Sequence, residues 1–509
     1  MILTSLNHWL REPATEQRHY ARSGVAISRR AFTHSTLAAT ALAALPARPL
    51  WADTSKPAVI PAQVNAIGLT GKPLTLTAAD IKELRAALRG PLLLAADEGY
   101  DTARRIWDPS IDHHPALIAR CSNAQDVIHA VNFARTHQLR TAVRAGGHSV
   151  SGQSTPEGGL MIDVSPMKEI RVDARQRRAY AQGGVLLGEL DHAMQAVGLV
   201  TTLGTVSDTG IAGLTLGGGV GLLMRRFGLS IDNLISVDVV TADGKLLHAS
   251  EQENSDLFWG LRGGGGNFGV ATAFEYRLHP LQHPVLVGFR AFPYSAARSV
   301  FTAVAELADK APDELFLGVS VQNVAAGERA GRSVGCLAGY TGEDPAVGLK
   351  LLEPLAKLGK PLIDTVAPTS YLAAQSMRND ERADSPARLA VPSVPKTWYE
   401  SGYLYSAPDA LFDEMIRRFD AVPPYFDAGA GFSQMGGAIA RVKQDATAFW
   451  NRPAKYDSIV DVSWSDSAKD EEARKAARDV WTGMEPFTRG HYVNTVPGAS
   501  SQRVRATYG

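Results

Sequence analysis

Cysteine is almost absent from this chain, which has only Cys121 and Cys336 among its 509 residues. The two lie too far apart in sequence to form a zinc-ligand pair, and two thiols cannot build a disulfide framework. The sequence leaves open a single long-range bridge between them. The chain is therefore neither a disulfide-stapled module nor a zinc-ribbon protein, and its length is sufficient for a large core in at least two domains or subdomains.

An excess of charge of one sign is also absent, because 52 Lys and Arg balance 52 Asp and Glu. Such a chain offers no bulk attraction to nucleic acid or to an anionic membrane, so we expect a small, roughly neutral substrate. The GxSxG, HExxH and Walker motifs are missing as well. The run from Asp112 to His114 has no partner at ligand spacing, so we interpret it as a polar loop and expect no metal site.

Long hydrophobic runs are missing too. The apolar run at residues 37–45 is shorter than the roughly 20 residues that a membrane helix needs. It follows SRRAFT at residues 28–33, which has the form of a twin-arginine export signal. We therefore expect residues 1–52 to be a cleaved signal segment of a periplasmic or secreted protein without stable membrane insertion. The alternative interpretation is a disordered basic leader.

The first half of the remaining chain alternates helix and strand signals without the regular rhythm of a doubly wound sheet. Thr77 with Asp80, and Ser122 with Gln125, have the spacing of capping boxes that begin helices. An Asp-Gly pair predicts a hairpin over residues 236–250. The other expected elements are helices at residues 77–90 and 187–197 and strands at 141–144, 160–164 and 178–182.

Beyond residue 280 the pattern changes to longer strands and amphipathic helices. The pattern is typical of one antiparallel sheet with helices on one face, so the sequence predicts an α+β protein with a second domain that begins near residue 281. The expected strands are residues 285–292, 315–321 and 458–464, and the expected helices are 296–308, 408–419 and 469–484.

Glycine, in contrast, is abundant and clustered in GGH at 146–148, GIAGLTLGGGVG at 210–221 and RGGGGNFG at 262–269. Glycine lets the backbone approach a flat or phosphorylated ligand closely. The third cluster matches GxGxxG, but a helical pattern precedes it and a strand pattern follows it, the reverse of a Rossmann site. Together the clusters predict one long, flat, phosphate-bearing ligand that His148 faces.

Five runs extend this pattern into a resemblance: VRAGGHS, MIDVSPMKEIRVD, AQGGVLLGEL, TGIAGLTLGGGVGLLMRRFGLSIDNL and LRGGGGNFGVATAFEYRLHP. With them the chain resembles the berberine-bridge-enzyme-like FAD-linked oxidases of the vanillyl-alcohol-oxidase superfamily. The resemblance implies a PCMH-type FAD-binding domain of two α+β subdomains at residues 75–280. It also implies a substrate domain at 281–488, with an antiparallel sheet covered by helices. We expect residues 489–509 to return to the FAD domain and to be truncated relative to the family.

In that family the histidine of the GGH motif is bonded to the 8α-methyl group of FAD, which implies a covalent role for His148. A hydrogen bond within the turn is the alternative. Ala212 stands where some relatives carry a second, cysteinyl link, so the resemblance implies one bond. The other residues implied for the FAD site, each of whose glycines alternatively marks only a tight turn, are Arg144, Ala145, Gly146, Gly147, Ser149, Gly210, Ile211, Gly213, Gly217, Gly218, Gly219, Asn267 and Gly269.

The catalytic base is implied by a Tyr-x-Asn motif that alcohol- and sugar-oxidising relatives carry near the C-terminus. Here Tyr492 and Asn494 match it. A free phenol has a pKa near 10, so its surroundings must lower that pKa for it to act as a base near neutrality. The alternative is a tyrosine packed in the core. Tyr403 and Gln434 are further candidates for the substrate side of the flavin.

The resemblance therefore implies an exported FAD-dependent oxidase that oxidises a CH–OH or CH–NH group of a small molecule, with dioxygen as acceptor and hydrogen peroxide as product. Two alternatives stay open. One is a flavin dehydrogenase with another electron acceptor, and the other is a non-catalytic or truncated flavin-binding protein.

Overall fold

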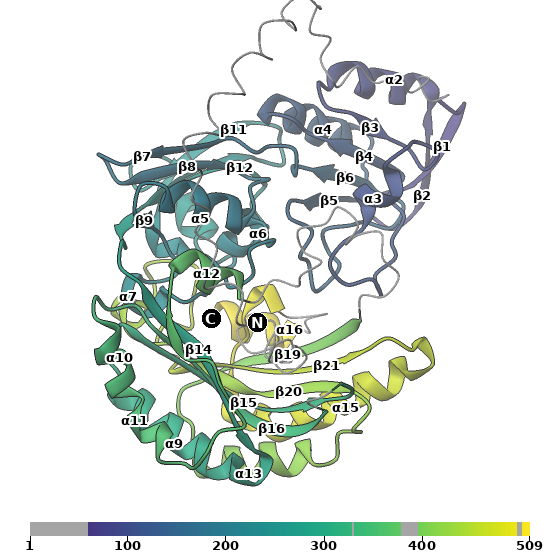
Figure 1. Cartoon of the computed structure of the whole chain (residues 1–509). Helices are drawn as coiled ribbons and strands as arrows, with labels where there is room; N and C mark the ends of the chain where they lie inside the picture. Colours follow the sequence, from purple (N-terminus) through teal and green to yellow (C-terminus); the bar gives the residue numbers. More distant parts are fainter. Residues whose placement is uncertain (1–59, 328–329, 378–394, 496–500) are drawn as a thin grey trace, which may run out of the picture. The chain divides into compact units, whose positions relative to one another are not determined.

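The computed structural model describes residues 60–327, 330–377, 395–495 and 501–509. The expected signal segment, residues 1–52, lies outside the described residues. The main sheets of the described part have four, five and nine strands (Figure 1). This mixed α and β architecture confirms the predicted fold class.

The four-stranded sheet carries the first glycine cluster, because its edge strand β5 ends at Arg144 just before that cluster begins. Strands β4 and β5 both pair in parallel with β6, whose residues are all buried. Helices α2 and α4 accompany this sheet. The bounds are β3 Leu92–Leu93, β4 Leu117–Arg120, β5 Thr141–Arg144, β6 Leu160–Asp163, α2 Ala78–Ala87 and α4 Ala124–Thr136.

The two predicted helix caps have different outcomes. Thr77 and Asp80 form the predicted capping box at the start of α2. The second cap is shifted by one residue, because Asn123 is the N-cap of α4 and its side chain accepts from the Asp126 amide. Ser122 stays outside the helix, where its amide and hydroxyl both donate to Asp126. A carboxylate that collects several donors outcompetes the predicted box.

The five-stranded sheet is antiparallel, with the order β11-β10-β12-β8-β7. The predicted hairpin is present as β10 (Leu234–Val240) and β11 (Leu246–Ser250). Helix α8 (Ser255–Leu261) and strand β12 (Val270–Arg277) flank the third glycine cluster, in the order that excluded a Rossmann site. The other elements of this part are β7 Ile170–Asp173, β8 Arg178–Gln182, α5 Leu187–Gln195 and α6 Ile211–Leu216.

The nine-stranded sheet has one face covered by helices, as the sequence predicts (Figure 1). Alternate strand residues on that face join the helices in an apolar core. The division of the chain at residue 281 stays a prediction. The strands are β14 Val285–Pro293, β15 Leu315–Val324, β16 Gly331–Tyr340, β17 Ile363–Asp364, β18 Ala367–Thr369, β19 Lys396–Leu404, β20 Asp427–Gln434, β21 Tyr456–Trp464 and β22 Thr488–Arg489, and the covering helices include α9 Ala297–Lys310, α13 Asp409–Phe419 and α15 Asp470–Met484.

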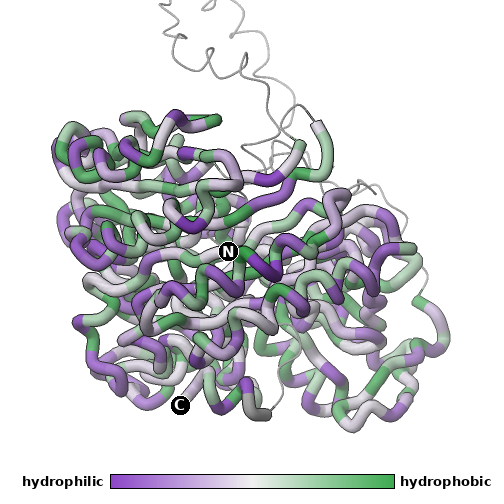
Figure 2. The backbone as a smooth tube through the Cα atoms, turned by 90° about the horizontal axis from the view of Figure 1, so that it is seen from below, coloured by the Kyte–Doolittle hydropathy of each residue, from purple (hydrophilic) through white to green (hydrophobic). Residues whose placement is uncertain are grey.

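Hydrophobic and hydrophilic segments interleave along the backbone (Figure 2). Across the described ranges, no helix is long and apolar enough to cross a bilayer. Cys121 and Cys336 are both buried and both free, so the long-range bridge that the sequence left open does not form.

Candidate functional site

Arg144 holds the first glycine cluster in place. Its buried guanidinium group lies 3.3 Å from Asp163 Oδ1, and its Nε donates to the carbonyl of Arg105. The next turn wraps around it, since Gly147 has a φ of 73° and a Cβ there would lie 3.0 Å from the guanidinium group. Arg144 therefore supports the loop, and the pyrophosphate contact that the resemblance implied stays a prediction.

Gly146 and Gly210 bring the first and second clusters into direct backbone contact. A Cβ on Gly146 would lie 2.3 Å from the Gly210 nitrogen, and a Cβ on Gly210 would lie 2.6 Å from the Gly146 nitrogen. Any side chain at either position would push the two segments apart. These two predicted residues thus meet because neither has a side chain.

The third cluster meets the second at the end of α6. The amides of Gly263 and Gly265 both donate to the Leu216 carbonyl at 3.0 Å. Within the third cluster, the Asn267 side chain donates to the Gly264 carbonyl at 2.7 Å and so shapes its own turn. All three glycine clusters, which span more than a hundred residues of sequence, therefore converge on one short helix.

His148 leaves the first cluster toward two residues that the sequence did not single out. Its Nε2 lies 3.2 Å from Asp208 Oδ1. Its ring stacks on Trp107 with 6.2 Å between centroids, and Trp107 in turn lies 5.9 Å from the ring of Tyr399 on β19. Asp208 stands two residues before Gly210, so its nearness to a glycine cluster was an available signal. Trp107 carried no such signal, because only the fold brings it here.

Tyr492 lies at the other end of the second cluster, and it is 1% exposed. Its hydroxyl accepts from the Gly219 amide at 3.2 Å and from Asn494 Nδ2 at 3.0 Å. Asn494 also donates to the Leu214 carbonyl. Burial nevertheless raises the pKa of Tyr492 to about 12. The described residues around Tyr492 thus do not lower its pKa as a phenol base requires, and its role as the base stays a prediction.

Asp457 on β21 is a further functional candidate, and it stands in no sequence motif. It pairs across the sheet with Tyr403 on β19, and both side chains are buried. Burial raises the pKa of Asp457 to about 6. Burial is the main cause of the raised pKa of both Tyr403 and Tyr492. The charge of Asp457 is a further cause, because the three groups lie close together. Asp457 and Asp461 are four residues apart in a strand, so they share one face of it, and two carboxyl groups on one face of a buried strand were the signal that could have found them.

Gln434 does not line the substrate side, which corrects the prediction. Its Nε2 donates to the Ala308 carbonyl of α9 at 2.8 Å, on the helix-covered face. The physical reason is strand alternation: Phe432 packs in the core beneath the helices, so Gln434, two residues on, shares that face. Tyr403 instead belongs to the core on the opposite face, together with residues of the glycine clusters.

The remaining predicted residues make no side-chain hydrogen bond described above, and several of them pack against other segments. Ile211 is fully buried in the core, and Gly269 packs against β10, where a Cβ would lie 2.3 Å from the Val240 carbonyl oxygen. Of the others, Ala145 and Ser149 are half-buried, Gly213 has open space where a Cβ would be, Gly217 lies against Asn494, and Gly218 lies against Phe449.

Four buried hydroxyls near the clusters test whether this site fits FAD. The hydroxyls of Ser154, Thr155, Thr201 and Thr202 are buried and have no hydrogen-bond partner within the described part of the chain. The first two follow His148 in the same loop, and the other two precede the second cluster. Hydroxyls and glycine amides are the donors that bind phosphate oxygens. The residues present therefore fit a phosphate-bearing cofactor.

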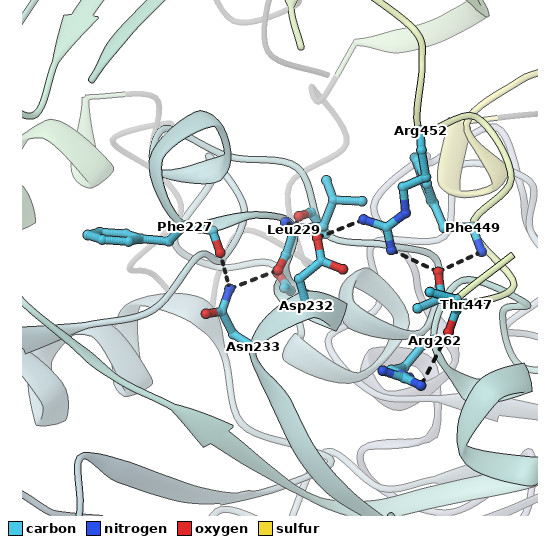
Figure 3. A network of polar contacts seen from close by, with 11 residues as sticks. Phe227, Leu229, Asp232, Asn233, Arg262, Thr447, Phe449 and Arg452 are labelled. Atoms are coloured by element: carbon cyan, nitrogen blue, oxygen red, sulfur yellow. Dashed lines mark hydrogen bonds and ion pairs between the residues drawn. The ribbon is translucent and has the colours of Figure 1, made fainter. Parts of the chain in front are cut away.

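A buried polar network ties the segment after β20 to Asp232, which follows the second cluster in the sequence (Figure 3). Arg452, 1% exposed, donates to Asp232 at 2.7 Å and to Thr447 at 2.8 Å. Its guanidinium group also lies over the ring of Phe449. Phe449 contacts Gly218 and meets the ring of Tyr403 edge-on at 5.9 Å. The network thus fixes an aromatic residue between a glycine cluster and the nine-stranded sheet.

The C-terminal helix α16 (Ser501–Tyr508) lies beside the third glycine cluster. The Tyr508 hydroxyl donates to the Gly264 carbonyl at 3.5 Å, and Asn451 Nδ2 donates to the Thr507 carbonyl at 3.3 Å. These contacts join α16 to the third glycine cluster and to the segment after β20, and the return of residues 489–509 to the FAD domain stays a prediction.

Comparisons with known proteins agree with this site. Residues 115–250 match the family model of an FAD binding domain. An FAD-linked oxidoreductase of Dictyostelium discoideum is 30% identical over 434 residues, which are 84% of this chain and 91% of that protein. The structure of 6-hydroxy-D-nicotine oxidase from Arthrobacter nicotinovorans has a TM-score of 0.73 at 25% identity, covering 83% and 92% of the two chains. Berberine-bridge-enzyme-like protein 1 of Physcomitrella patens has a TM-score of 0.74 at 22% identity, covering 84% and 93%.

Glycine clusters from three parts of the chain meet at α6, and residues 115–250 match an FAD binding domain. The protein is therefore a flavin-dependent oxidoreductase, and thus an enzyme. Within that class, the chain belongs to the FAD-linked oxidoreductases, and it shares its fold with a berberine-bridge-enzyme-like protein.

Proposed function

We propose that this enzyme is an oxidase that binds FAD covalently through His148 and oxidises a CH–OH or CH–NH group of a small molecule. The observation that carries the proposal is the convergence of the three glycine clusters on α6, with His148 at one end of the arrangement and Tyr492 and Asp457 at the other. When bound, FAD accepts a hydride equivalent from the substrate carbon and passes the electrons to dioxygen, which yields hydrogen peroxide.

Asp208 and Trp107 prepare His148 for this role. A carboxylate beside one ring nitrogen fixes the orientation of an imidazole and the position of its proton. Stacking on Trp107 limits rotation of the ring further. The two contacts hold the imidazole ring of His148 in one orientation, which a side chain needs in order to act as a nucleophile.

Asp457 accepts the proton of the substrate hydroxyl or amine. Its carboxyl is buried beside Tyr403 and Tyr492, and its pKa of about 6 leaves it ionised at neutral pH. Tyr492, whose pKa is about 12, stays protonated and positions the substrate instead. This assignment replaces the phenol base that the resemblance implied.

Acid precipitation tests the covalent link. We expect flavin absorbance to stay with the denatured wild-type protein and to be released from the His148→Ala variant. Free flavin in the wild-type supernatant would contradict a covalent bond. Mass spectrometry of the flavin-bearing peptide would show independently whether His148 is the attachment site.

Dioxygen as acceptor separates an oxidase from a dehydrogenase on the same scaffold. During turnover we expect one hydrogen peroxide for each substrate oxidised. Reduced flavin that reoxidises slowly in air but rapidly with a quinone would favour the dehydrogenase. A loaded flavin that no alcohol, polyol, sugar or amine bleaches under anaerobic conditions would favour a non-catalytic flavin-binding protein.

Export by the twin-arginine route is a further part of this proposal, supported by Arg29 and Arg30 within SRRAFT. Fractionation of cells that express the full chain tests it, with the double substitution of both arginines by lysine as the control. Wild-type protein that stays in the cytoplasm, indistinguishable from the control, would contradict export.

A further inference from the structure

The nine-stranded sheet has one apolar face and one face rich in polar side chains. The apolar face packs beneath α9, α13 and α15. The opposite face shares a core cluster with the glycine segments through residues such as Tyr399, Tyr403 and Ile459. Strand alternation places further polar residues on that same face. This polar face is the side of the sheet from which the site described above takes Asp457.

Several buried polar atoms of this face have no hydrogen-bond partner among the described residues. In one row across the sheet they are the Tyr403 hydroxyl, Asp457 Oδ1 and the Ser433 hydroxyl. In a second row they are Gln322 Oε1 and the Ser333 hydroxyl. All five side chains are more than nine-tenths buried. Because buried polar atoms are costly to leave unpaired, a polar occupant is expected to complete both rows.

The two rows are widely separated. The pairing register shows how far apart they are. Each of three strands contributes one residue to the first row and one, four residues away, to the second: 403 and 399 of β19, 457 and 461 of β21, and 433 and 429 of β20. Four residues of strand span roughly 13 Å. Within the second row, Gly429 pairs with Gln322 and contributes no side chain, and Asp461 lies over it, with Oδ1 2.7 Å from where a Cβ would be. The second row thus also has a carboxyl group.

The spacing discriminates between ligand chemistries. An ammonium group concentrates three N–H donors at one point and cannot reach both rows. An apolar ring would leave both rows unpaired. Hydroxyl groups both donate and accept, which matches a mixture of carboxyl and amide acceptors with Ser and Tyr hydroxyls. A ligand with hydroxyls spread along its length satisfies the two rows together.

We propose that the substrate is a polyhydroxylated compound, a polyol or saccharide, whose reacting end lies at Asp457 and Tyr403 and whose far end hydrogen-bonds to Gln322 and Ser333. The proposal rests on the proposed function, because it names the substrate of that same site. It concerns only which molecules reach the flavin, not how the flavin is attached.

Anaerobic reduction of the flavin-loaded enzyme tests the substrate class. The probes are glycerol, xylitol, sorbitol, glucose, cellobiose and maltose, with benzylamine and benzyl alcohol as amine and apolar comparisons. We expect bleaching of the flavin by polyols or saccharides and none by the comparison compounds. Bleaching by benzylamine or benzyl alcohol alone, or no response to any polyol or saccharide, overturns the inference.

The substitutions Gln322→Ala and Ser333→Ala test the second row. Each is expected to raise KM for the longest active probe by about 3- to 10-fold, with little change in kcat and little change in KM for the shortest active probe. Gln434→Ala is the matched control, since this glutamine is equally buried but faces the helices. Equal effects of Gln322→Ala on long and short probes, or the same effect from the control, overturn the assignment.

Failure of the inference and failure of the proposed function are distinguishable. The substrate test follows flavin colour, which bleaches whether or not the cofactor is covalently bound. Flavin that is released by acid yet is bleached by a polyol would contradict the covalent link and support the substrate class. Covalent flavin that is bleached only by an amine would do the reverse.

Discussion

At the scale of single residues, the proposed function depends on two carboxyl groups, one half-buried and one buried, whose partners come from distant segments. Asp208 and Asp457 both lie at the site, and neither stands in a recognisable motif. Their roles follow from the side chains that the fold places beside them. Each role predicts a different measurable change on substitution.

Removal of Asp208 should slow the attachment of flavin. A hydrogen bond to a charged group contributes about 1.5–3 kcal/mol, so Asp208→Ala should slow attachment at least about tenfold. The measurement is the covalent fraction over time after FAD is added to apoprotein, from flavin fluorescence in denaturing gels. Asp238→Ala is the control, because Asp238 makes a similar contact with His248 at a more exposed position. Equal attachment rates in wild type and Asp208→Ala would refute this role.

Asp457 should control the acidic limb of the pH profile. Burial raises the pKa of this carboxyl to about 6, so its basic form is lost as pH falls through that value. We expect kcat/KM to fall about tenfold per pH unit below 6 and to be level above it. Asp457→Asn should remove the limb and lower the plateau by about 10²- to 10⁴-fold.

Tyr492→Phe provides the comparison for that profile. The phenol of Tyr492 has a pKa of about 12 and is protonated throughout the neutral range. Its loss should lower kcat while the limb near pH 6 is retained. If Tyr492→Phe removes the acidic limb while Asp457→Asn retains it, the tyrosine is the base and the assignment to Asp457 is wrong.

At the scale of elements, the site depends on loops that approach each other without side chains. Helix α6 is only six residues long, yet it receives contacts from the clusters on both sides of it in sequence. Such an arrangement gives stability only when all the segments fit together. A single methyl group at the point of contact should therefore have a large effect.

Gly146→Ala tests this contact. The new Cβ would lie 2.3 Å from the Gly210 nitrogen, so one of the two backbones must shift. Overpacking of this kind costs about 1–3 kcal/mol, and we expect a lower Tm and reduced flavin content. Gly213→Ala on α6 is the stability control, because a Cβ there meets nothing within 4 Å and alanine favours helix. Equal Tm values for the Gly146 variant and the wild type would contradict the contact.

At the scale of the whole molecule, the described residues are joined by buried contacts between segments far apart in sequence. Arg452 and Asp232 are separated by 220 residues, and both side chains are almost fully buried. Because the pair fixes Phe449 against Gly218 and Tyr403, it links stability to the geometry of the site.

Arg452→Ala should destabilise the enzyme strongly. It leaves Asp232 as an unpaired buried charge, which costs about 3–5 kcal/mol. We expect a large fall in Tm by scanning calorimetry. The double variant with Arg452→Met and Asp232→Leu should recover much of it, because two apolar side chains replace both charges. A double variant as unstable as the single one would show that packing, not the unpaired charge, is responsible.

Much of the fold was predictable because it depends on local patterns. The strand at residues 141–144, the hairpin through its Asp-Gly pair and the capping box at Thr77 are all present as predicted. The cap at Ser122 was shifted by one residue, because Asp126 also takes the amides of Arg89 and Gly90. Those donors come from a segment more than thirty residues away, which a local pattern does not include.

The sequence by itself determined the glycine clusters, the histidine behind the first of them and the alternation of the strands, because each depends on residues that are neighbours along the chain. The tertiary structure decided which side chains share the site. It placed Asp208 and Trp107 beside His148, moved Gln434 to the helix-covered face and brought Asp457 next to Tyr403 and Tyr492. The physical reason is that burial and pairing set the pKa and the orientation of a side chain, and both depend on segments that meet only in the folded protein.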